Sequence, residues 1–222
     1  MVTQTTRTGR AAAAAGVLMT AGVEGEWLLN PQRDDGTITS KPEFALLLVL
    51  STVGFGLLVA AVRGLRREAD RPTKPARVGA RMSLIGAGLL VLFGAMVLVS
   101  GVISGSPLEV SFLAFALGLL LLSIGPVIWG MSLRRQSPAP GVWQVLVLAG
   151  VTAFATIAIP LDPWHDVTLV AMFLAWSVVG VLLLRYRTIS AVAPASSPAH
   201  AARPAATNAA GRTPESSRGT GG

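Results

Sequence analysis

Two glutamates at the end of the first apolar stretch are the side chains best placed to do chemistry inside a membrane. Glu24 and Glu26 follow the apolar residues 11–23 and stand beside Trp27. A carboxylate at mid-membrane costs roughly 2.5 to 3.5 kcal/mol, and intramembrane acids commonly mark ion or proton pathways. Because a helix turns about 100° per residue, the two side chains point about 200° apart, and at most one can face the inside of a bundle. We predict Glu24 and Glu26 as candidate functional acids at the outer edge of the membrane.

A second polar group lies in the segment LDPWHD. Asp162, His165 and Asp166 have the side-chain types of a zinc site or a proton relay. Asp162 followed by Pro163 also fits the start of a helix, where the aspartate accepts backbone N–H groups and proline occupies the first turn. One loop with a single histidine is a weak metal signal, so capping is the favoured interpretation. We predict no metal and no cofactor.

Another segment, Ser106-Pro107-Leu108-Glu109, has the spacing of a capping box with proline in the first helical position. It predicts that a helix begins directly after Ser106.

Sequence motifs of enzymes are absent from the chain. The sequence has no cysteine, two histidines, no Walker loop, no H-E-x-x-H and no G-x-S-x-G. We therefore expect a protein that is not an enzyme.

The elements that would position these acids are membrane helices. The 222-residue chain is 52% hydrophobic and 13% charged, against about 25% charged for a soluble domain. Spanning the hydrocarbon core takes about 20 apolar residues as a helix. Five stretches meet this without a charge, and none alternates with period two. The predicted fold is an all-α polytopic membrane bundle, with spans over residues 11–29, 44–62, 82–103, 110–133, 142–161 and 167–184.

The first of these segments is the weakest. Residues 11–23 are too short to span alone, and extension to residue 29 includes both glutamates. A cleaved signal peptide, with Arg7 and Arg10 as its basic end, is the competing interpretation of residues 11–29. We favour a retained helix.

Charge placement predicts how the chain crosses the membrane. With six spans, 16 of the 18 basic residues fall on one side and 8 of the 11 acids on the other. The positive-inside rule makes the basic side cytoplasmic. Residues 1–10 and the Ala-, Pro- and Ser-rich tail 188–222, which we expect to be disordered, would then both be cytoplasmic.

The connection between the second and third spans is the most basic part of the chain. Its side chains are candidate contacts for anionic lipid headgroups. They are Arg63, Arg66, Arg67, Arg71, Lys74, Arg77 and Arg81. Because prolines interrupt this connection and the charge follows a membrane face, we expect membrane lipids as partners and no nucleic acid.

The amino-acid composition indicates the source of the protein, and the spacing of its small residues indicates a role. Sixteen arginines against two lysines, with much Ala, Gly and Pro, are typical of a GC-rich bacterial genome, so we expect the bacterial cytoplasmic membrane. Small residues spaced by four, as in Ala12/Gly16/Thr20, allow close helix packing within one chain, and also contacts in a homo-oligomer or with other membrane proteins. The favoured function is a non-enzymatic accessory, assembly or regulatory protein of the cell envelope. The alternative is a transporter or channel for a small solute or cation.

Overall fold

Six helices account for almost all of the described chain. The computed structural model describes residues 2–29, 38, 40–68, 72–106, 108–134, 141–159 and 164–192. The helices are α1 (Val2–Leu29), α2 (Lys41–Glu68), α3 (Lys74–Ser104), α4 (Ser111–Leu133), α5 (Val142–Ala158) and α6 (Trp164–Val192). The predicted all-helical bundle is confirmed, with one helix over each of the six predicted stretches.

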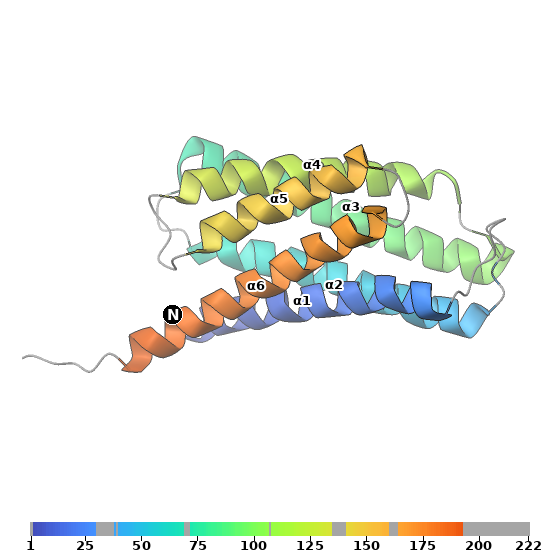
Figure 1. Ribbon diagram of the computed structural model, residues 1–222, viewed down its shortest axis with the longest axis horizontal. Coiled ribbons are helices and arrows are strands. Elements are labelled where there is room, and N and C mark those ends of the chain that lie inside the picture. Colours follow the sequence, from blue (N-terminus) through green and yellow to red (C-terminus); the bar gives the residue numbers. More distant parts are fainter. Residues whose placement is uncertain are drawn as a thin grey trace, which may run out of the picture.

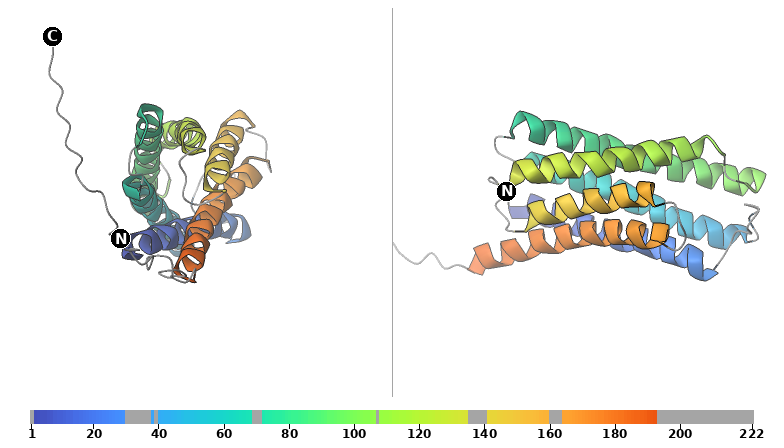
Figure 2. Two further views of the ribbon diagram at one scale, coloured as in Figure 1. Left: turned by 90° about the vertical axis from the view of Figure 1, so that its left-hand side faces the viewer. Right: turned by 45° about the horizontal axis from the view of Figure 1, so that its top comes forward.

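The helices form a closed ring in chain order. Each helix packs against the helices before and after it, and α6 packs against α1 to close the circle. The end-on view of the bundle shows the six helices arranged around a common centre (Figure 2). Successive helices run in opposite directions, so the start of α1 and the end of α6 lie at the same end of the bundle (Figure 1).

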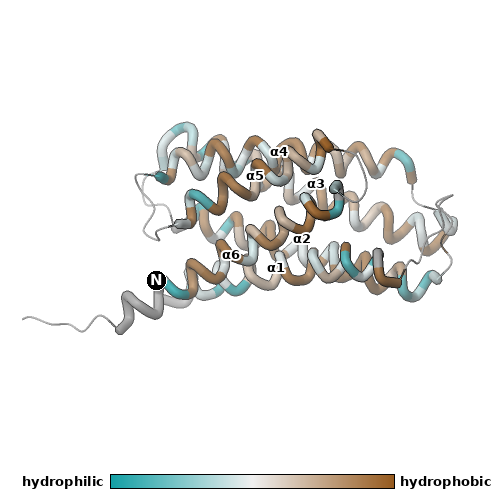
Figure 3. The backbone as a smooth tube through the Cα atoms, in the orientation of Figure 1, coloured by the Kyte–Doolittle hydropathy of each residue, from teal (hydrophilic) through white to brown (hydrophobic). Residues whose placement is uncertain are grey.

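Hydropathy identifies a multi-pass membrane protein. Four helices, α2, α3, α4 and α6, are long and apolar enough to cross a membrane. The apolar helix α5 has 17 residues, about 25 Å at 1.5 Å per residue, and is shorter than the roughly 30 Å core. Helix α1 carries charged residues near both ends, which lower its hydropathy. Apolar residues dominate the middle of the bundle and polar ones gather toward its ends (Figure 3).

Several helix boundaries differ from the predicted spans. Helix α1 begins at Val2, so most of the predicted tail 1–10 is helical, and α3 begins at Lys74 and not at residue 82. Helix α4 begins at Ser111 and not after Ser106, because residues 108–110 form a turn in which the Ser111 N–H donates to the Leu108 carbonyl at 2.9 Å. The predicted capping box at Ser106 is therefore wrong. Helix α6 continues to Val192, beyond the predicted end of the bundle at residue 187. The rest of the predicted disordered tail, residues 193–222, lies outside the described residues.

Small residues bring the helix backbones close together. A Cβ atom added to Gly16 of α1 would lie 2.3 Å from the Phe173 carbonyl oxygen of α6, and one added to Gly86 of α3 would lie 2.8 Å from the Gly118 carbonyl of α4. The Ser177 hydroxyl of α6 also donates to the Ala13 carbonyl of α1, at 3.2 Å. Glycine spacing thus produces the close packing that the sequence predicts, at seams between neighbouring helices of one chain.

Candidate functional site

A cavity of about 270 Å³ lies inside the ring, toward the end where α1 stops and α2 begins. Five helices contribute its walls, and each presents residues three or four positions apart, on one face of the helix. The lining residues are Val23, Glu26, Phe44, Leu47, Leu48, Ser51, Phe55, Phe93, Val97, Phe112, Phe115, Asp166, Leu169 and Phe173. We call this cavity the outer pocket, because the predicted topology places this end outside the cytoplasm.

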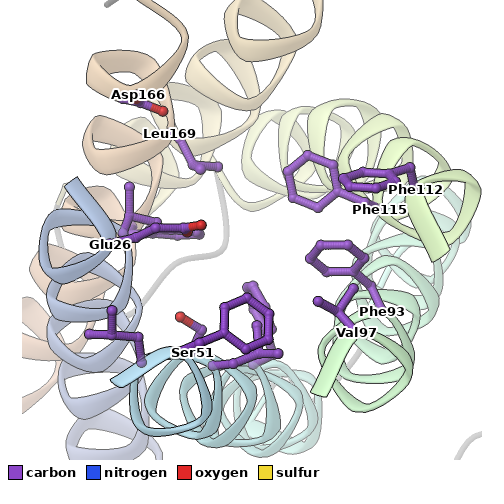
Figure 4. Close-up of a pocket in the computed structure, with 14 residues that line it drawn as sticks. Glu26, Ser51, Phe93, Val97, Phe112, Phe115, Asp166 and Leu169 are labelled. Carbon is purple, nitrogen blue, oxygen red and sulfur yellow. The ribbon is translucent and has the colours of Figure 1, made fainter. Parts of the chain in front are cut away.

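Two carboxylates line the outer pocket from adjacent helices. Glu26 lies in the last turn of α1 and Asp166 in the first turn of α6. The Glu26 side chain points into the hollow, and Asp166 lies on the same side of it (Figure 4). Glu26 is exposed and Asp166 half-buried, so both carboxylates are accessible from the pocket. The described lining includes no Lys, Arg or His, so these acids give the pocket a negative charge when ionised.

Aromatic rings face the carboxylates across the pocket. Six of the seven phenylalanines in the chain line it. On the α3–α4 side, the Phe93 ring centroid lies 5.9 Å from that of Phe112 and 4.9 Å from that of Phe115. On the α2–α6 side, Phe55 meets Phe173 edge to face at 6.1 Å. The first cluster stands opposite Glu26 and Asp166 (Figure 4). The pocket thus has a charged wall and an aromatic wall.

The pocket is closed on the side toward the centre of the bundle. One helical turn deeper along each lining helix lies a large apolar side chain with an exposed fraction of 2% or less. These floor residues are Met19, Leu58, Leu90, Leu119 and Trp176. They belong to one continuous core cluster that extends toward the other end of the bundle. The outer pocket is therefore a one-ended cavity and not a continuous pore in this conformation.

The structure separates the two predicted acids. Glu26 lines the outer pocket, whereas Glu24 is exposed and is not part of the lining. This placement follows from the 200° between the two positions, since Val23 and Glu26 share the inward face. A substitution at Glu24 therefore serves as a control for one at Glu26.

The structure brings only one member of the predicted group Asp162, His165 and Asp166 to the outer pocket. Asp166 reaches the outer pocket, His165 lies beside it in the first turn of α6, and Asp162 is outside the described residues. Among the residues that the structure describes, no three His, Asp or Glu side chains are grouped as metal ligands.

The predicted lipid contacts lie at the opposite end of the bundle. Arg63, Arg66, Arg67, Lys74, Arg77 and Arg81 are all exposed near the end of α2 and the start of α3. Arg71 lies outside the described residues. The exposed Arg7, Arg10 and Arg185 are at the same end, so this surface is strongly basic.

Sequence reasoning missed the phenylalanines and Ser51. Their spacing was a usable signal, because Phe112 and Phe115 are separated by three positions and Ser51 and Phe55 by four, as expected for one helix face. In a uniformly apolar span this spacing is not distinctive, since the lipid-facing surface is apolar too.

Comparisons with models of protein families, with curated proteins and with solved structures gave no match to this chain.

Proposed function

We propose that this protein is a non-enzymatic transport protein of the bacterial cytoplasmic membrane that binds a small organic cation in the outer pocket. The observation that carries the proposal is the pairing of Glu26 and Asp166 in a pocket whose described lining has no basic side chain. Two ionised carboxylates that line one cavity repel each other unless a counter-charge accompanies them. A bound cation supplies that counter-charge.

The aromatic wall supports an organic cation over a bare metal ion. Ammonium groups are attracted to the faces of phenylalanine rings by about 0.5 to 2 kcal/mol per contact. A divalent metal would instead require several oxygen ligands around one point. Two carboxylates and the Ser51 hydroxyl, spread over a cavity of about 270 Å³, suit a larger and softer charge.

The closed floor supports a transporter over an open channel. A transporter exposes its site to one side of the membrane at a time, and its neighbouring bundles or helices then rearrange around the site. In this proposal the structure corresponds to the outward-facing state. The core below the pocket would open in the other state.

The accessory role favoured by the sequence is the second proposal, and the ring geometry makes it the weaker one. Each of the six helices is already packed against a neighbour on both sides. An accessory role gives no reason for two acids and six phenylalanines to converge on one cavity. Cation transport accounts for both.

The proposal is tested by uptake of labelled tetraethylammonium into proteoliposomes with an internal negative potential. A hydrogen bond or contact with a charged group contributes about 1.5 to 3 kcal/mol, so Glu26→Gln should lower the apparent affinity roughly ten- to hundredfold. Glu24→Gln is the matched control, because it removes the same charge from a side chain two residues away that does not line the pocket. Uptake no greater than in protein-free liposomes, or equal loss in both variants, would rule the proposal out.

A further inference from the structure

Among the residues that the structure describes, none fills the wall of the outer pocket between α4 and α6. The described lining residues come from α1, α2, α3, α4 and α6, and none comes from α5, although α5 packs between α4 and α6 deeper in the bundle. Helix α5 stops after 17 residues, whereas α4 has 23. The α5 and α6 termini at this end stop well short of the ends of α2 and α3 (Figure 1). This side of the pocket therefore has no described helix to separate it from the surrounding lipid.

Exposed apolar side chains lie near the starts of the two helices that border this opening. At the start of α4, Phe112 is 52% exposed and Leu113 63% exposed. At the start of α6, Trp164 is 60% exposed and Val167 53% exposed. Tryptophan is enriched at the boundary between the hydrocarbon and the headgroups. The opening therefore faces the outer leaflet and not bulk water alone.

The contents of the pocket must match both of its walls. Carboxylates stand on the α1–α6 side and the Phe93, Phe112 and Phe115 rings on the α3–α4 side. A dry cavity of roughly 150 Å³ is enough to hold benzene. The outer pocket, at about 270 Å³, has room for one aromatic ring together with an ammonium head.

We propose that the ligand is an amphiphilic organic cation, with one ammonium group and an apolar body, that reaches the outer pocket sideways from the outer leaflet between α4 and α6. This inference rests on the proposed function, because it specifies the class of cation and its route. The ammonium group meets Glu26 and Asp166, and the apolar body packs on the aromatic wall. Such cations concentrate in the leaflet that the opening faces.

The ligand class is tested with three probes on the full chain in lipid nanodiscs. Benzyltrimethylammonium has a ring and a charge, tetramethylammonium has the charge alone, and neopentylbenzene has nearly the same shape without the charge. From the apolar area of the ring, benzyltrimethylammonium should bind about 30-fold more tightly than tetramethylammonium. Glu26→Gln should remove most of its advantage over neopentylbenzene, and Glu24→Gln should not.

The results separate the inference from the proposed function. Equal affinity for the two cations, with loss in Glu26→Gln, would overturn the amphiphilic ligand and leave organic-cation binding intact. Absence of binding by both cations, or equally tight binding of neopentylbenzene, would overturn the proposed function and the inference together.

The sideways route is tested by thiol accessibility, because the chain has no native cysteine. Ser51→Cys places a thiol in the pocket, and Val53→Cys places one on an exposed face of the same helix two residues away. A maleimide with a long alkyl chain should modify both thiols, and benzyltrimethylammonium should protect only the one at position 51. One result would overturn the sideways route. In it, the alkyl maleimide modifies the thiol at position 53 but not the one at position 51, and a water-soluble maleimide modifies the thiol at position 51.

Discussion

The contact between α1 and α6 closes the ring, and it depends on glycines, of which Gly180 is one. A Cβ atom added to Gly180 would lie 2.4 Å from the Ala13 nitrogen and 2.5 Å from the Gly9 carbonyl oxygen. Both neighbours are backbone atoms of α1, so no side-chain rotation can make room. We predict that Gly180→Ala separates α6 from α1 and destabilises the bundle.

The distances set the size of the effect. Ordinary van der Waals contact of a Cβ begins near 3.4 Å, so the two helices must move apart by about 1 Å. A gap of 0.5 to 1 Å already forfeits a quarter to a half of the dispersion energy of the atoms along the seam. Overpacking by one methyl typically costs about 1 to 3 kcal/mol. We expect the free energy of unfolding to fall by about 2 kcal/mol.

The matched control is Gly56→Ala. A Cβ added at Gly56 of α2 meets nothing within 4 Å, and the residue lies within a helix. Alanine has the higher helix propensity, by up to about 1 kcal/mol, so this variant should be as stable as the parent or slightly more stable.

The free energy of unfolding of both variants is measured by reversible unfolding in mixtures of dodecylmaltoside and sodium dodecyl sulfate. Tryptophan fluorescence follows the transition. Trp176 contributes to this signal, because it is fully buried in the core and lies one turn from Gly180 on α6. If Gly180→Ala unfolds at the same detergent fraction as Gly56→Ala, the close approach of α1 and α6 is refuted.

Three further predictions concern the membrane topology, the binding of anionic lipid and the hydrogen bond between α6 and α1. Thr73 and Ser106 lie at opposite ends of α3, so an impermeant thiol reagent added to intact cells should label Ser106→Cys and not Thr73→Cys. The reverse pattern would show that the predicted topology is inverted. Each exposed arginine near an anionic surface contributes about 1 kcal/mol, so Arg66→Gln with Arg77→Gln should lower the anionic phospholipid that copurifies, and unchanged lipid content would leave these residues only an orienting role. Ser177→Ala removes a hydrogen bond to α1 and should cost only about 0.6 kcal/mol in the same unfolding measurement; a loss above about 2 kcal/mol would show that the hydroxyl does more than bridge two helices.

The helices were predictable because lipid imposes a simple rule on the chain. Backbone groups in hydrocarbon must bond within their own segment, so a stretch such as residues 82–103 has to form a helix. Boundaries were less predictable where competing turns satisfy the same groups. Ser106 begins a sequence that resembles a capping box, yet the turn at residues 108–110 supplies hydrogen bonds first and delays α4 to Ser111.

The site was only half predictable. The charge of Glu26 in an apolar helix marked it from the sequence, and the helical angle showed that it and Glu24 could not share a cavity. Nothing local placed Asp166 beside it, because that proximity requires α6 to pack against α1, at a separation of 140 positions along the chain. The order of helices around a ring is a property of the whole fold.

The distribution of glycine and phenylalanine accounts for the place of the pocket. The glycines with the tightest backbone contacts lie at the middle of the bundle and toward its basic end. A Cβ atom added to any of them would lie less than 3.0 Å from backbone of a neighbouring helix; they include Gly79, Gly86, Gly125, Gly130, Gly150 and Gly180. At the level of the outer pocket, six phenylalanine rings line the space between the helices. The rings meet at 43° to 64°, the tilted and edge-to-face arrangements that aromatic pairs prefer. Phe93→Ala removes a central ring of the aromatic wall, so it should weaken the binding of benzyltrimethylammonium in nanodiscs by about 2- to 30-fold; an unchanged affinity would refute the contact between this wall and the ligand.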